Sequence, residues 1–429
     1  MPTTQAAALD LQVYRKLNRR LLPFLACLYV IAYIDRVNIG FAKLTMAEQL
    51  GFSDSIYGLG AGIFFIGYFL FEIPSNLILH RVGAKIWIAR IMIVWGLLAA
   101  AMVFVSTPMQ FYILRFLLGV GEAGFFPGII LYLTYWYPAP RRAKATATFM
   151  ASVALAGVIG SPLSGFIMTY LDGVSTLTGW QWLFLIEAVP AIILGIIVAF
   201  WLENGPEQAR WLTSDERNWL NSQLTAESLN KEQTGHIICF SKALCNSKLW
   251  LLSFTYFSIV MGFYGISFWL PQIVNTLVHQ NLMLTGLLSA IPYAIAAIGM
   301  VVVGHLSDKN NERRWHIVSS ALAGCLGLLI SAIYNDTLLL ALFGLSLASL
   351  GILSALSIFW SLPTAFLSGT AAAGGLALIN AFGNLAGYLS PVLVAWIKTQ
   401  TGDFTSALYM LATWLIVAAA IVLIKFRTL

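Results

Sequence analysis

The sequence predicts an all-α membrane protein with twelve transmembrane helices. Of the 429 residues, 59% are hydrophobic and only 10% are charged, whereas a soluble domain carries about 25% charged residues. A helix needs about 20 apolar residues to cross a bilayer, and runs of this length use up most of the chain. The composition therefore excludes a soluble enzyme. The formal net charge of +6 indicates basic cytoplasmic loops and not a nucleic-acid surface.

The twelve apolar runs must be helices, because only helices leave no backbone group unpaired over such segments in lipid. The first run follows a basic segment and carries Asp35 and Arg36. It is therefore a spanning helix and not the uncharged core of a cleaved signal peptide. In chain order the predicted spans are 21–41, 55–79, 86–105, 109–137, 144–170, 180–202, 248–275, 283–307, 315–334, 337–365, 371–396 and 404–425.

Basic residues predict the orientation of these spans. With a cytoplasmic N-terminus, 19 of the 24 Lys and Arg residues fall in the inner segments, and only Lys43 and Lys398 fall in outer loops. This asymmetry follows the positive-inside rule and predicts that both termini are cytoplasmic. The short tails and loops favour a bacterial inner membrane.

One long polar connection divides the spans into six and six. In this connection Thr213 and Glu216 fit a capping box, and apolar residues at helical spacing follow them. They predict a short amphipathic helix on the membrane surface. The expected units are therefore an N-terminal six-helix bundle at 1–202, a cytoplasmic linker at 203–247 and a C-terminal six-helix bundle at 248–429.

An internal repeat relates the two halves. Gly160-Ser161-Pro162 in the fifth span matches Leu389-Ser390-Pro391 in the eleventh, and the loop after the second span matches the loop after the eighth at nearly the same offset. A duplicated half predicts a pseudo-two-fold transporter with its binding site between the halves.

The loop after the eighth span, Gly304-x-x-x-Asp308-Lys309-x-x-x-Arg313, resembles the loop signature of the major facilitator superfamily. The copy after the second span departs from that signature, with Asn76 and His80 in place of the glycine and the aspartate. The resemblance implies a gating role for Gly304, Asp308 and Arg313.

Further stretches resemble the anion:cation symporter branch of that superfamily. Three of them begin at Tyr33-Ile34-Asp35-Arg36-Val37-Asn38, Phe71-Glu72-Ile73-Pro74-Ser75-Asn76 and Arg115-Phe116-Leu117-Leu118-Gly119, and the third continues through Glu122 to Gly128. A fourth stretch, Gly179-Trp180-Gln181-Trp182-Leu183-Phe184, is similar to the tartrate and hydroxyphenylacetate permeases of the branch.

Away from the ends of the predicted spans, the charged side chains all belong to the first half. Each one costs at least a few kcal/mol at mid-membrane, so each is a functional hypothesis. At a rise of 1.5 Å per residue, Asp35, Arg36 and Arg115 fall at one level, and Glu122 lies on the Arg115 face about 10 Å deeper. The full set is Asp35, Arg36, Glu72, Arg90, Arg115, Glu122 and Glu187.

These charges suggest anion binding coupled to proton binding. The planar fork of arginine pairs with carboxylates, so Arg36 and Arg115 are candidate binders of an anionic substrate. Asp35 and Glu122 are candidate proton carriers, because a substrate on the arginine removes the counter-charge of the carboxylate and favours its protonation. The alternative is that Asp35–Arg115 and Arg36–Glu122 are buried pairs that only fix helix packing. The family resemblance implies the functional roles for all four.

The remaining charges are predicted to be mainly structural. Glu72 would pair with a basic loop residue, and Arg90 would extend its guanidinium to the membrane surface. Glu187 fits either a structural or a functional role. Among uncharged side chains, Tyr264 stands out in the seventh span, and Asn384 shares a helix face with Asn380. Similarity to the branch places Tyr33, Tyr68, Ser357, Trp360 and Asn380 where cavity-lining residues are expected, with simple packing as the alternative.

Together these features predict a secondary transporter that imports a small organic carboxylate by proton symport and alternating access. Candidate substrates are hydroxy acids such as tartrate, sugar acids and aromatic acids like hydroxyphenylacetate. The alternatives are a proton-independent organic-anion exchanger or an efflux transporter and, from another class, a membrane-embedded enzyme or sensor. The absence of an HExxH motif and of a catalytic dyad disfavours the enzyme.

The expected partners are the organic anion, protons and the lipid bilayer, and the expected state is a monomer. No nucleic acid, metal or cofactor is predicted. The spacing of His236, Cys239 and Cys245 fits no standard zinc pattern.

Overall fold

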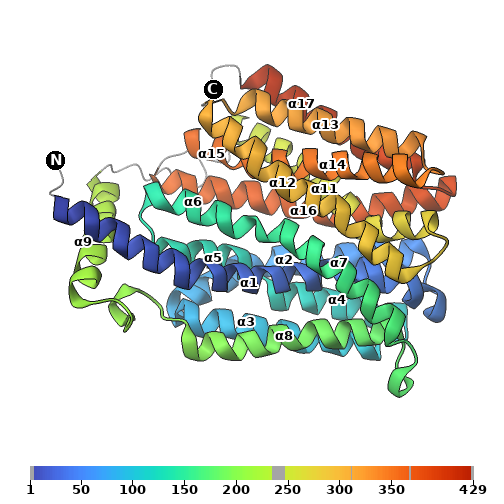
Figure 1. The fold of residues 1–429 in the computed structure, drawn as a ribbon, viewed down its shortest axis with the longest axis horizontal. Helices are drawn as coiled ribbons and strands as arrows, with labels where there is room; N and C mark the ends of the chain where they lie inside the picture. Colours follow the sequence, from blue (N-terminus) through green and yellow to red (C-terminus); the bar gives the residue numbers. More distant parts are fainter. Residues whose placement is uncertain (1–3, 234–246, 311, 367–368, 427–429) are drawn as a thin grey trace.

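A computed structural model of the chain describes residues 4–233, 247–310, 312–366 and 369–426. The zinc-like group of His236, Cys239 and Cys245 lies outside these residues. Within them every regular element is helical, and twelve segments are long and apolar enough to cross a membrane. The predicted fold class is thereby confirmed. Both ends of the chain lie at one end of the molecule (Figure 1), which we call the termini side, and the opposite end is the far side.

Seven of the spans are single helices that run from one end of the molecule to the other. Short loops join neighbouring antiparallel helices, as expected for spans separated by a few residues. These seven helices are α1 (Thr4–Leu50), α2 (Asp54–Val82), α8 (Gly179–Trp201), α11 (Ser247–Leu277), α12 (Leu282–Lys309), α13 (Arg314–Ile333) and α17 (Thr405–Lys425). An eighth, α16 (Gly369–Thr401), carries the eleventh span at Leu378–Thr401.

The other four spans change helix type or break within the membrane. The third ends in a 3-10 turn, and the fifth divides near Ala151. The tenth divides at Trp360. These elements are α3 (Ala84–Ala101) with η1 (Met102–Phe104), α4 (Pro108–Glu122) with α5 (Phe125–Thr134), α6 (Ala139–Met150) with α7 (Ser152–Tyr170), and α14 (Leu338–Phe359) with α15 (Ser361–Phe366).

The break in the fourth span corrects the continuous helix predicted over 109–137. α4 ends at Glu122, and Gly124 follows with φ +85°, a left-handed conformation that glycine adopts at no steric cost. A Cβ atom at Gly124 would lie 2.3 Å from Ser75 Oγ, so α2 approaches the chain closely at this point. The break places Glu122 at a helix end instead of in mid-helix.

The first span is longer at both ends than the predicted 21–41. α1 continues to Leu50, so Lys43 is a buried helical residue, only 4% exposed, and not an outer-loop residue as predicted. Its ammonium is held by the side chains of Asp54 and Gln272, which explains how a lysine is kept in this position.

Three helix pairs join the first half of the chain to the second: α7 with α12, α2 with α16, and α1 with α11. Glycines permit this close approach. A Cβ at Gly58 of α2 would lie 2.5 Å from Ala395 Cβ of α16, and one at Gly165 of α7 would lie 2.9 Å from the Cα of Gly286 in α12. Because these glycines lie toward the far side, the two halves are in tight contact there.

The polar connection contains η3 (Pro206–Gln208) and α9 (Ser214–Gln233). The predicted capping box is present: the Thr213 amide donates to Glu216 Oε2 at 2.9 Å, and the Glu216 amide donates to Thr213 Oγ1 at 3.3 Å. Lys16 of α1 also donates to the Glu216 carboxylate at 2.8 Å. α9 is therefore attached to the termini side of α1, next to which it lies in Figure 1.

Candidate functional site

A buried ion pair joins Arg36 of α1 to Glu122, the last residue of α4. Arg36 Nη2 donates to Glu122 Oε1, and the two residues are 6% and 1% exposed. This is one of the two pairs considered from the sequence. A buried ion pair adds little stability by itself, and removal of either partner leaves an uncompensated charge.

Aromatic residues from both halves of the chain surround the Arg36 guanidinium. Its Cζ lies 5.0 Å from the ring centre of Tyr33 and 5.4 Å from those of Tyr68 and Phe64. Nη1 donates to the hydroxyl of Tyr264 on α11 at 3.4 Å. Arg36 thus contacts α2, α4 and the second half at once, in a setting that favours a cation through the faces of the rings.

Asp35 belongs to a different network, because successive residues of a helix point about 100° apart. The Trp95 indole N–H of α3 donates to Asp35 Oδ2, and Asn38 Nδ2 donates to Asp35 Oδ1 at 3.3 Å. Asn38 also lies close to Glu187, which accepts a hydrogen bond from Ser164 Oγ at 2.9 Å. Trp95 was not identified from the sequence, since nothing in an apolar run marks one tryptophan as the partner of a distant carboxylate.

Arg115 is fully buried, and its guanidinium donates hydrogen bonds to the backbone of α2. Its Nε donates to the Gly60 carbonyl at 3.1 Å, and Nη2 donates to the Ala61 carbonyl at 3.4 Å. The ion pair with Asp35 that the sequence allowed is not formed within the described residues. α4 can lie this close to α2 because residue 119 is glycine: a Cβ there would be 2.0 Å from the Phe64 carbonyl oxygen.

Glu72 has partners that the sequence did not predict. Asn380 Nδ2 donates to Glu72 Oε1 at 2.7 Å, and Asn384 Nδ2 donates to Oε2 at 3.1 Å. The expected ion pair with a basic loop residue is not found in the part of the chain that the structure describes. Two amides of α16 replace it, so this buried carboxylate of α2 joins the two halves of the chain.

The other predicted lining residues lie around the end of α14. The Trp360 ring packs edge to face on Tyr256 of α11, with centroids 4.9 Å apart. Ser357 Oγ donates to the Ser354 carbonyl of its own helix at 2.9 Å. Among the described residues, no hydrogen bond or ring contact joins either side chain to the Arg36–Glu122 pair. Arg90 packs its guanidinium 4.7 Å from the Trp87 ring centre.

The signature loop after the eighth span forms a compact polar cluster. Arg313 Nη1 pairs with Asp308 Oδ1 at 2.5 Å and donates to Ser307 Oγ at 3.0 Å. Ser307 Oγ in turn donates to the Glu312 carbonyl at 2.6 Å. A Cβ at Gly304 would meet nothing within 4 Å, so no close contact requires glycine there in this conformation.

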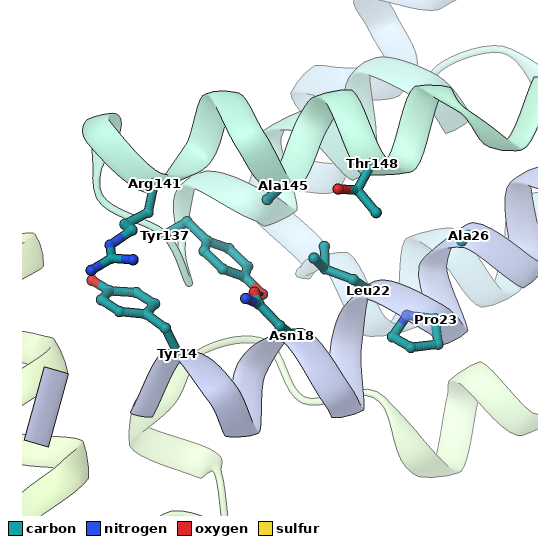
Figure 2. A pocket seen from close by; sticks show the side chains of 9 residues that line it. All are labelled: Tyr14, Asn18, Leu22, Pro23, Ala26, Tyr137, Arg141, Ala145 and Thr148. Carbon is teal, nitrogen blue, oxygen red and sulfur yellow. Dashed lines mark hydrogen bonds between the residues drawn. The ribbon is translucent and has the colours of Figure 1, made fainter. Parts of the chain in front are cut away.

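A cavity of about 350 Å³ lies elsewhere, between α1 and α6 near the termini side (Figure 2). Arg141 and Tyr14 stand at one end of it, and Tyr137 donates to Asn18 at 3.0 Å. None of the predicted site residues lines this cavity. Within the described ranges no group of three or more His, Cys, Asp and Glu side chains could hold a metal ion.

The chain matches a family model described as Major Facilitator Superfamily over residues 25–391. A protein of Agrobacterium vitis named "Putative tartrate transporter" is 49% identical over 420 residues, which are 98% of this chain and 96% of that protein. The "Quinolone resistance transporter" of Acinetobacter baumannii is 39% identical over 400 residues, which cover 93% of this chain and 92% of that protein.

Two solved structures have the same overall fold. A bacterial homologue of the human lysosomal transporter Spinster, in an inward-facing and occupied conformation, gives a TM-score of 0.76 at 18% identity over 96% of this chain and 97% of its own. The xylose transporter XylE of Escherichia coli, in an inward-open conformation, gives 0.74 at 17% identity over 97% and 96%. At these identities the similarity concerns the fold alone.

Proposed function

The chain belongs to the major facilitator superfamily, and we propose that it imports a small organic carboxylate together with protons. It is a multi-pass membrane transporter of small organic substrates and not an enzyme. The observation that carries the finer proposal is the buried Arg36–Glu122 pair, which Tyr264 of the second half reaches through Arg36. The name of the tartrate relative supports an organic acid as substrate.

In this proposal the carboxylate of the substrate takes the place of Glu122 on the Arg36 guanidinium. The planar fork of arginine can hold either carboxylate bidentately. Glu122 then loses its counter-charge in a buried position, and a buried carboxylate without a counter-charge binds a proton readily. Substrate binding and protonation are thereby coupled through one arginine.

Hydroxylated acids suit this site best. The phenol of Tyr264 already accepts from Arg36, and Tyr33 and Tyr68 lie against the same guanidinium. Phenolic hydroxyls can donate to a carboxylate and accept from a substrate hydroxyl. We therefore favour tartrate-like or sugar acids over hydroxyphenylacetate-like acids.

The remaining predicted residues receive separate roles in the proposal. Asp35 is a second proton carrier inside the first half. Arg115 positions α4 on α2 and becomes available to the anion only when those helices shift. On the side of the second half, Ser357, Trp360 and Asn380 line the substrate path, and Gly304, Asp308 and Arg313 form the gating loop.

The proposed transport cycle moves the two halves of the chain, 1–202 and 248–429, against each other, with 203–247 as the cytoplasmic linker. We take the termini side as the cytoplasmic side of a bacterial inner membrane because the sequence assigns 19 of the 24 Lys and Arg residues to the inner segments. A monomer contains both halves and is sufficient for this cycle.

Proton uptake into liposomes tests the proposal. The purified chain is reconstituted with a pH dye inside, and tartrate, a sugar acid and hydroxyphenylacetate are added outside. We expect the lumen to acidify with a hydroxylated acid and not with liposomes that lack the protein. Uptake of labelled acid without acidification would overturn proton symport but leave organic-acid transport.

A second candidate is efflux, which the similarity to the quinolone resistance protein favours. In that case the buried carboxylates exchange protons against an outgoing molecule. Inverted gradients distinguish the two functions: outward accumulation of a quinolone driven by an inward proton gradient would replace the import proposal.

A further inference from the structure

A cluster of two lysines and one aspartate closes the far side between the two halves. Asp54, at the start of α2, accepts from Lys43 of α1 through Oδ1 and pairs with Lys398 of α16 through Oδ2 at 2.8 Å. Lys43 also donates to Gln272 of α11. The cluster therefore ties α1 and α2 to α11 and α16, and the far side cannot open while these contacts persist.

The cluster has too little negative charge for its cations. Two ammonium groups share a single carboxylate, while the Lys43 and Lys398 side chains are only 3% and 15% exposed. Each ammonium has more N–H donors than one shared carboxylate satisfies. The indole N–H of Trp269 is also buried without an acceptor among the described residues, and its ring lies 4.0 Å from Lys43 Nζ. Surplus positive charge and an unused donor together favour an additional anion.

The cluster lies on the same face of α1 as Arg36. Lys43 follows Arg36 by seven residues, nearly two helical turns, so both point from the same face of α1 about 10 Å apart. On α11, Tyr264 contacts Arg36, and Gln272 contacts Lys43 two turns further on. An anion that leaves the lysines toward the centre of the molecule therefore meets the Arg36 guanidinium next.

We propose that Lys43 and Lys398 form an anion-recruiting site, where the carboxylate of the arriving substrate displaces Asp54 from Lys398 and releases the contact between α2 and α16. The inference rests on the proposed function, since it takes an organic carboxylate as the ligand. The exchange replaces one carboxylate by another on the same buried ammonium groups. It therefore costs less than opening the contact with no anion present, which would leave Lys398 without a carboxylate partner.

The first test compares Lys398→Gln with the full-length wild type in sided liposomes, with tartrate supplied at the far side. The substitution removes the surplus charge and leaves Lys43 balanced by Asp54. We expect KM for uptake to rise roughly tenfold with little change in kcat, because the loss of attraction slows capture of the anion. The dependence of KM on ionic strength should weaken as well.

Two further variants make this comparison specific. Lys398→Arg keeps the charge and should retain a KM close to that of the wild type. Lys425→Gln removes the same charge from an exposed position at the end of α17 and should leave KM unchanged. A wild-type KM in Lys398→Gln would overturn the anion-recruiting site while leaving the transport proposal intact.

A second readout does not require transport. Ser289 of α12 is fully buried, in the helix that packs on α7, so a cysteine there reacts with an impermeant maleimide only when the far side opens. Tartrate should speed labelling of Ser289→Cys, and addition of Lys398→Gln should abolish that effect, with labelling of the parent chain subtracted.

The two readouts separate the two proposals. Absence of tartrate uptake by the wild type, with labelling that tartrate still stimulates through Lys398, would refute the proposed function for tartrate and support the recruiting site. Labelling that does not respond to tartrate would refute the recruiting site.

Discussion

The Arg36 guanidinium of α1 pairs with the carboxylate of Glu122 at the residue where α4 ends. The left-handed Gly124 two residues later turns the chain into α5, so the carboxylate stands at a break and not in a continuous helix. Broken helices are a common setting for substrate and ion sites in transporters. The pair thus places a buried charge at a point where the helical backbone is interrupted.

Replacement of Glu122 by Gln should separate proton coupling from substrate binding. Glutamine keeps the size of the side chain but cannot carry the proton, so proton-driven accumulation should be lost. Exchange of labelled for unlabelled substrate needs no net proton movement and should remain measurable in counterflow. Equal loss of both activities in a folded variant would remove Glu122 from the role of proton carrier.

Arg36→Lys and Arg115→Lys should differ in their main effect. Arg36 is held by a carboxylate and a phenol, and loss of its fork should raise KM roughly tenfold or more, as expected for a charge-assisted hydrogen bond of about 1.5–3 kcal/mol. Arg115 donates to two backbone carbonyls of α2, so its replacement should mainly lower Tm. A larger effect of Arg115→Lys on KM would make Arg115 the principal anion binder.

The sequence predicted the fold because local patterns determine it, and it identified Arg36 and Glu122 as one possible buried pair. Apolar run lengths gave the twelve spans, whereas helical rise placed Glu122 about 10 Å deeper than the level of Arg36. Each inference needed only residues that are neighbours in sequence or share one helix face.

The parts that the sequence could not predict depend on distant residues. The amides that bind Glu72 lie 308 and 312 positions later in the chain, so no spacing rule connects them. The break at Gly124 depends on its approach to Ser75 of another helix, and a glycine in an apolar run is equally compatible with straight packing. Lys43 was counted as a loop residue because only its contacts with Asp54 and Gln272 reveal why it is buried.

A double-mutant cycle on Glu72→Gln and Asn384→Ala should show a favourable coupling between α2 and α16. One interhelical hydrogen bond in a membrane contributes about 0.6 kcal/mol on average, so the coupling free energy should be of that order or slightly larger. The measurement is thermal or denaturant unfolding of the wild type, both single variants and the double variant in detergent. Additive effects would mean that the Glu72–Asn384 contact is not maintained in solution.

Gly119→Ala should destabilise the first half. The Cβ of the new alanine would lie 2.0 Å from the Phe64 carbonyl oxygen, a backbone atom that cannot move without displacing α2. Overpacking of this kind costs typically 1–3 kcal/mol, and Tm should fall accordingly. Gly205→Ala is the matched control, because a Cβ there meets nothing within 4 Å. Equal Tm values for the two variants would contradict the close α2–α4 contact.

The attachment of α9 should weaken at acidic pH. Burial opposes ionisation of Glu216, but hydrogen bonds from Lys16 and Thr213 outweigh it and lower the pKa of this carboxyl below its ordinary value. A carboxyl whose pKa is lower in the folded state stabilises that state at pH values above its unfolded pKa, about 4.3. This contribution is lost as the pH falls through the lower folded value.

Glu216→Gln should reproduce the acid effect at neutral pH, because the amide removes the charge that pairs with Lys16, while its oxygen can still accept from the Thr213 amide. A partly exposed ion pair of this kind contributes up to about 1 kcal/mol. Hydrogen exchange in α9 should therefore be several-fold faster than in the wild type at pH 7, while exchange in the buried spans stays unchanged. After correction for intrinsic exchange rates, the difference between the two proteins should shrink as the pH falls below about 4.3, the ordinary pKa of the carboxyl. A difference that does not change with pH would show that the glutamine perturbs α9 by its shape and not through the lost charge.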